Sequence, residues 1–183
     1  MNWPKTAWLL LLAFLGVFAE AAVEWPRPWW GVQVNVLPPL MVYAAASTDL
    51  ASLALLALLG GLWSDSLSAN ALGASVAPLL VIGLVTEHWR DLVLRELPYA
   101  QFILGSAATA LAPLLTLLIL LSVGQHPLLG WGSLGQWVAT SLVGGALTPI
   151  CFRLLDRLEA WFTYQPMRES PFRPDRQIKR GRS

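Results

Sequence analysis

The chain has 183 residues, of which 56% are hydrophobic and only 13% are charged. A typical globular domain has about 25% charged residues, and one core of this size could not remove so much apolar surface from water. This composition excludes an ordinary soluble domain and indicates a membrane protein. The single cysteine, Cys151, excludes a disulfide framework and a thiolate metal cluster, and the two histidines lie far apart with no ligand-like spacing.

Six apolar segments follow one another along the chain and predict an all-α fold, a polytopic membrane bundle of about six transmembrane helices. They cover residues 7–23, 32–47, 50–63, 71–86, 100–123 and 134–155. A span needs about 20 apolar residues, so the second to fourth segments are short. Tilted, re-entrant or merged segments, which would leave five or four spans, therefore stay open as alternatives.

The first apolar segment also raises the question of a signal peptide. Lys5 precedes it, and Ala19-Glu20-Ala21 is similar to a small-residue cleavage site. Because the rest of the chain is itself embedded in the membrane, a retained first helix is the simpler interpretation.

The aromatic and basic residues agree with six spans. Tryptophan is enriched at membrane–water interfaces, and all ten tryptophans lie at or near predicted segment ends: Trp3, Trp8, Trp25, Trp29, Trp30, Trp63, Trp89, Trp131, Trp137 and Trp161. With six spans, Lys5, the loop with Arg90 and Arg95, and the basic C-terminal tail share one side. The positive-inside rule then predicts that both termini are cytoplasmic.

The bundle is expected to occupy residues 1–158 and a basic cytoplasmic tail residues 159–183. Eight of the twelve Lys and Arg residues follow residue 150, and the tail has few large apolar residues, which predicts disorder. The tail could determine topology, bind anionic membrane lipids or dock a cytoplasmic partner. Nothing folded presents its charge, which argues against nucleic-acid binding.

The stretch "GLWSDSLSANALG", residues 61–73, places Asp65 at the end of a long apolar run. An ionisable residue inside a span is a functional candidate by default. However, the neighbouring Trp63 indicates interface depth, and a polar turn of Ser64, Ser66, Ser68 and Asn70 surrounds the aspartate. We therefore expect Asp65 to cap the following helix or to mark the loop.

Small residues and prolines recur inside the apolar runs. Gly60-Gly61, Ala108 with Ala112, and Gly144-Gly145 have the spacing of helix-packing positions. Intramolecular packing is the first interpretation, and a partner-facing groove is the alternative. The prolines predict bent helices around a cavity or groove: Pro38, Pro39, Pro78, Pro113 and Pro149.

Enzyme chemistry finds little support in the sequence. Ser75 has only His126 downstream as a base, in a Gly/Pro loop that would not aim it. Asp49 and Asp65 would lie about 24 Å apart on one continuous helix, too far to share a proton as a catalytic dyad. We expect no catalytic residue, no metal and no cofactor.

The stretch "LALLGGLWSDSLSANALGASVAPLL", residues 55–80, resembles the signature of the MreD family of rod shape-determining membrane proteins. Gly61-Leu62, Asp65 and Leu72-Gly73 match it in order and spacing. The tail is longer and more basic than in the family, and the tryptophan content is higher. The resemblance implies a non-enzymatic, multi-pass component of the bacterial inner membrane. Its implied partners are an MreC-like protein, an MreB-like filament, a RodA-like glycosyltransferase and a penicillin-binding transpeptidase.

The resemblance also implies a fold similar to the substrate-binding subunits of energy-coupling-factor (ECF) vitamin transporters. Such a subunit is the alternative function, but vitamin capture needs a pocket with several convergent polar groups, and the polar residues here cluster at the segment ends. On the scaffold hypothesis, the 87–98 loop and the tail face the filament. The 64–70 and 124–135 loops face the periplasm. Asp65 fixes the turn, Gly61 and Gly73 allow close helix approach, and Asp65→Ala weakens complex assembly without preventing insertion.

Overall fold

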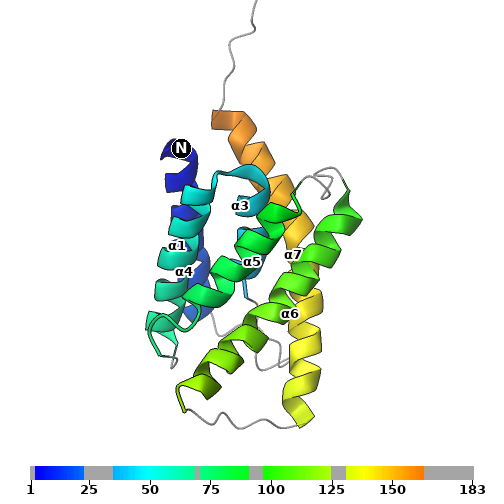
Figure 1. Cartoon of the computed structure of the whole chain (residues 1–183). Helices are drawn as coiled ribbons and strands as arrows, with labels where there is room; N and C mark the ends of the chain where they lie inside the picture. The colour runs from blue at the N-terminus through cyan, green and yellow to red at the C-terminus, as the bar shows by residue number, and fades with distance from the viewer. Residues whose placement is uncertain (1–2, 23–34, 69–70, 91–96, 125–130, 163–183) are drawn as a thin grey trace, which may run out of the picture.

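The computed structural model describes residues 3–22, 35–68, 71–90, 97–124 and 131–162, and the regular elements in these ranges are all α-helices (Figure 1). The predicted all-α class is confirmed. The helices are α1 (Trp3–Ala22), α3 (Leu37–Ser47), α4 (Leu50–Leu67), α5 (Val76–His88), α6 (Pro98–Ser122) and α7 (Trp131–Phe162).

Four of these helices, α1, α4, α6 and α7, are long and apolar enough to cross a membrane. The other two are apolar but short, with 11 residues in α3 and 13 in α5. At 1.5 Å per residue they extend about 17 and 20 Å, less than the hydrocarbon thickness of about 30 Å. The prediction of six spans is thus confirmed in a coarser form: the chain is a helical membrane protein with four candidate transmembrane helices.

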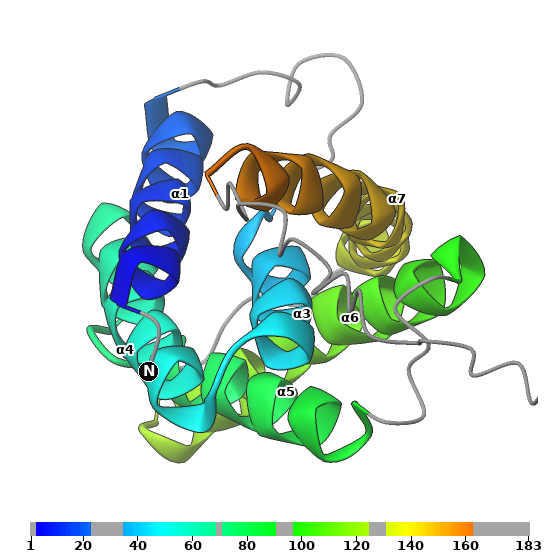
Figure 2. The same ribbon diagram turned by 90° about the horizontal axis from the view of Figure 1, so that it is seen from above.

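Helix α3 lies at the centre of the bundle, surrounded by the other described helices (Figure 2). Every residue of α3 except Ser47 is buried, as expected for a helix that is apolar on all sides. Pro38 and Pro39 lie in its first turn, where N–H groups have no helical acceptor in any case. Because neighbouring helices cover α3, it does not need to match the full lipid thickness itself.

Helices α6 and α7 cross at a seam of small residues. A Cβ atom on Gly144 would lie 2.7 Å from the Cβ of Thr109, and one on Gly105 would lie 2.6 Å from the Cβ of Thr148. Both threonine hydroxyls donate to carbonyls four residues earlier in their own helices, so the seam leaves them satisfied. The intramolecular interpretation of the Gly144-Gly145 pair is confirmed at this seam.

Large apolar side chains cover the outward faces of the long helices. On α1 they are Trp8, Leu11, Phe14, Leu15 and Phe18, and on α6 they are Ile103, Leu111, Leu114, Leu118 and Leu121. Contiguous apolar faces of this kind are unfavourable in water but match hydrocarbon. The exposed surface therefore agrees with the composition in indicating a bilayer.

The two ends of the bundle differ. An ion pair of 2.7 Å between Lys5 and Glu159 joins the start of α1 to the last turns of α7, and we call this the termini end (Figure 1). The opposite end carries the α4–α5 turn, residues 65–75, and we call it the turn end. Helix α7 ends at Phe162, so the first residues predicted for the tail are helical, and the rest of the tail lies outside the described residues.

Candidate functional site

The carboxylate of Asp65 organises the α4–α5 turn. It is only 1% exposed, and it accepts hydrogen bonds from the backbone N–H of Gly73 (2.8 Å), the backbone N–H of Ser75 (3.0 Å) and the Ser75 hydroxyl (2.6 Å). The donors precede and open α5, where unpaired N–H groups and the helix dipole favour a negative charge. Asp65 thus caps the following helix from the preceding one, and its buried charge is compensated by three donors.

The other residues of the 61–73 pattern have separate places around this turn. A Cβ on Gly61 would lie 2.8 Å from the Cα of Val76, so the start of α5 packs directly on the α4 backbone there. Gly73 has φ +90° and an open surrounding, so backbone conformation is its reason for being glycine and the expected close approach is wrong for it. Leu72 is 73% exposed, so its side chain lies on the outer surface of the turn.

Asp49 lies at the opposite end of α4 from Asp65. Helix α4 is continuous from Leu50 to Leu67, with Asp49 at its N-cap position, so the two carboxylates cannot form a dyad, in agreement with the sequence argument. The Ser52 hydroxyl donates to Asp49 at 2.9 Å, and this hydrogen bond lowers the pKa of the Asp49 carboxyl. Ser52 in turn lies 2.7 Å from the Thr6 hydroxyl, which ties α4 to α1.

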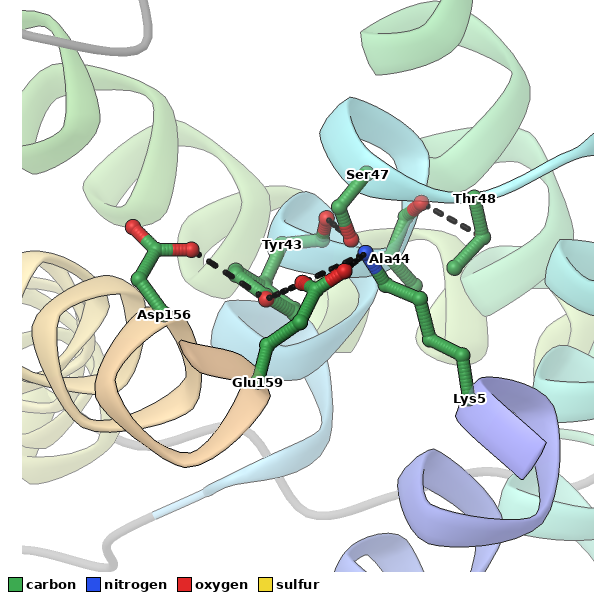
Figure 3. Close-up of polar contacts among 7 residues, drawn as sticks. All are labelled: Lys5, Tyr43, Ala44, Ser47, Thr48, Asp156 and Glu159. Atoms are coloured by element: carbon green, nitrogen blue, oxygen red, sulfur yellow. Dashed lines mark hydrogen bonds and ion pairs between the residues drawn. The ribbon is translucent and has the colours of Figure 1, made fainter. Parts of the chain in front are cut away.

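A polar cluster at the termini end joins three helices (Figure 3). The buried Tyr43 hydroxyl of α3 lies 3.3 Å from Asp156 and 3.4 Å from Glu159 of α7, and it donates to this carboxylate pair. Glu159 also accepts two hydrogen bonds from Lys5 of α1. Burying a hydroxyl without a partner is costly, so these carboxylates fix the depth of α3 between α1 and α7.

This cluster could not be predicted from the sequence, in which Lys5 was interpreted as a topology signal and as the flank of a possible signal peptide. The available signals were local: Tyr43 is the one phenol in an otherwise apolar helix, and Asp156 and Glu159 share a face at i, i+3. Neither signal reveals that the tyrosine and the carboxylates, more than 110 residues apart, meet in space.

The turn end contains a cavity of about 370 Å³. Ser64 of α4 and the turn residues Ser68 and Ser75 line one wall, and Ser75 is the same residue that donates to Asp65. The buried aspartate therefore positions part of the cavity wall without lining the cavity itself. Pro78, in the first turn of α5, and Pro113, inside α6, also line the cavity.

Helices α6 and α7 form the facing walls of the cavity. Thr109 and Thr116 come from α6, and Gln136 and Thr140 come from α7. Trp137, predicted only as an interfacial residue, faces this cavity too, and its Nε1 donates at 2.9 Å to the carbonyl of Ala110. Polar residues near the ends of separate segments, where the sequence placed them, thus meet in one cavity, a convergence that the sequence did not predict.

Within the described ranges, no group of three or more His, Cys, Asp or Glu side chains is arranged to hold a metal ion. Comparison with models of protein families, with curated proteins and with solved structures gave no match for this chain.

Proposed function

We propose that this protein is a non-enzymatic scaffold of the bacterial cell-wall elongation machinery, similar to MreD, in the cytoplasmic membrane. The observation that carries the proposal is the α4–α5 turn. The residues on which the resemblance rests are not scattered: Gly61, Asp65 and Gly73 all belong to one junction, in which a carboxylate binds the start of the next helix. A pattern that encodes one rigid turn is a more specific match than glycine and aspartate near helix ends alone.

Helix directions support six crossings with both termini on one side. The Thr6–Ser52 contact places the start of α4 beside the start of α1, whereas Asn35, before α3, lines the cavity at the turn end together with Ser75, before α5. Helices α3 and α5 thus run from the turn end toward the termini end. Short helices can serve as crossings where protein rather than lipid surrounds them.

Charge supports a cytoplasmic location of the termini end. Lys5, Arg153 and Arg157 belong to this end, and the basic tail follows α7 in the sequence. On the positive-inside rule the termini end and the 87–98 loop face an MreB-like filament. The turn end faces the periplasm, where it would contact an MreC-like protein, a RodA-like glycosyltransferase and a penicillin-binding transpeptidase.

The test is affinity purification of the tagged chain from mild detergent, followed by mass spectrometry. We expect MreC-like, filament and penicillin-binding proteins with the wild type and a reduced yield of them with Asp65→Ala at equal membrane levels. Asp49→Ala, at the other end of the same helix, is the matched control and should recover partners as the wild type does. Absence of all elongation proteins from the wild-type sample would contradict the scaffold.

The cavity supports one second candidate, a substrate-binding subunit of an ECF-type transporter. Its volume of about 370 Å³ is within the range of small-molecule sites, about 300–1,000 Å³. The same purification separates the two functions, because a capture subunit would recover a pair of ATPases with a coupling membrane protein instead.

A further inference from the structure

The cavity at the turn end combines polar and apolar walls in an ordered way. On α6, Thr109 and Thr116 are seven residues apart and share one face with Pro113, Leu117 and Leu120, which also line the cavity. Hydroxyls and hydrocarbon are thus presented side by side on the same wall. This pattern matches ligands that carry hydroxyl groups around a compact carbon skeleton.

Several polar side chains that line this cavity make no hydrogen bond within the described structure. In the portion of the chain that the structure describes, the side chains of Ser64, Gln136 and Thr140 make no hydrogen bond, and all three line the cavity. Thr140 is nine residues into α7, about 14 Å from its start. Thr140 is half-buried, so its hydroxyl is open to the cavity and can donate to or accept from a polar molecule bound there.

The charges of the lining residues indicate whether the ligand is charged or neutral. Among the described lining residues, Glu20 is the single charged side chain, and apart from the Trp137 indole, which donates to Ala110, the remaining polar groups are hydroxyls and amides. Each of these groups can both donate and accept, which suits uncharged hydroxyl groups. No described lining residue carries a positive charge that could compensate an anion.

We propose that the turn-end cavity binds an uncharged, hydroxyl-rich group, either a free sugar or polyol or the headgroup of a neutral glycolipid. Gln136 and Thr140 of α7 and Thr116 of α6 hydrogen-bond its hydroxyls, while the leucines and Pro113 contact its carbon skeleton. The inference rests on the cavity and on neither candidate function. Ligand binding is tested on the purified chain without partners. A failure to bind would therefore leave the scaffold function untouched, and a failure to recover partner proteins would leave ligand binding untouched.

The first measurement uses the full chain in mild detergent and tritiated glucose and myo-inositol in a scintillation proximity assay. Unlabelled glucose 6-phosphate is the charged competitor. A second arm places the protein in nanodiscs with monoglucosyl diacylglycerol and detects retained lipid by native mass spectrometry. Binding in the first arm identifies a free polyol, and retention in the second arm alone identifies a headgroup.

The variants are Thr140→Val, which replaces the hydroxyl with a methyl group, and Gln136→Leu at an exposed position that should not affect folding. Each should weaken binding about 5- to 10-fold, the effect of one lost uncharged hydrogen bond. The matched control is Thr86→Val: Thr86 is buried in α5 and bonded to the Ile82 carbonyl, away from the cavity, so affinity should change less than twofold.

Three results would overturn the proposal. One is that neither neutral probe nor the glycolipid binds, and another is that glucose 6-phosphate competes as well as glucose. The third is that Thr140→Val and Gln136→Leu, with thermal midpoints like that of the wild type, bind as the wild type does.

Discussion

Replacing Asp65 tests whether the turn depends on its hydrogen bonds. The Asp65 side chain is only 1% exposed. In Asp65→Ala, the N–H groups of Gly73 and Ser75 lose this charged acceptor. A hydrogen bond to a charged group contributes about 1.5–3 kcal/mol. Three such bonds are lost, and water can replace part of them at these half-buried donors, so the free energy of unfolding should fall by about 3–5 kcal/mol. Asp65→Asn keeps one carbonyl oxygen for the two N–H groups, and it should lose only about 1–2 kcal/mol.

The assay is reversible unfolding in mixed micelles by titration with sodium dodecyl sulfate, followed by tryptophan fluorescence. Asp49→Ala is the control, because Asp49 is exposed at the other end of α4 and should affect the midpoint far less. The reasoning is refuted if Asp65→Ala is no more damaging than Asp49→Ala, or if Asp65→Asn is as damaging as Asp65→Ala.

Other predictions use the same assay. Gly61→Ala should destabilise by about 1–3 kcal/mol, because its new methyl group would overlap the backbone at the start of α5. Gly135→Ala, where a Cβ meets nothing within 4 Å, is the control and should be neutral or stabilising; equal effects of the two would contradict the packing argument. Gly144→Ala should push α6 from α7 and lower the midpoint, and an unchanged midpoint would show that the seam can relax. The hydrogen bond from Ser52 lowers the pKa of Asp49, so ionised Asp49 adds stability above its unfolded pKa. That stability is lost as the pH falls through the folded pKa. Asp49→Asn should therefore flatten the acid side of the pH–stability curve, and parallel curves for variant and wild type would argue against this.

Two of the long helices could be predicted closely from the sequence, whereas α7, Trp131–Phe162, extends past both ends of the expected segment 134–155. The expected segment 100–123 corresponds to α6, Pro98–Ser122, and 7–23 corresponds to α1, Trp3–Ala22. These boundaries depend on local features, namely continuous apolar runs that stop at a proline, a glycine or charged residues. The capping role expected for Asp65 is also local, because the carboxylate and its donors are at most ten residues apart.

The central position of α3 in the bundle could not be predicted from the sequence. Residues 32–47 are apolar like the other segments, so composition alone predicted one more span, with a tilted, re-entrant or merged segment as the alternative. Its shortness was the only local sign of a difference, and burial by the surrounding helices is a property of their packing. The link between Tyr43 and Asp156 is equally non-local.

The sequence by itself determined that the protein belongs in a membrane, that it is helical and that Asp65 caps the helix after it. These features depend on hydropathy and capping, which act over one or two helical turns. Only the tertiary structure decided which helix is central and which polar groups meet. In the sequence, nothing connects Thr116 on α6 with Thr140 on α7. They become two walls of one cavity because the glycine seam sets how closely α6 and α7 approach, and that distance depends on both helices together.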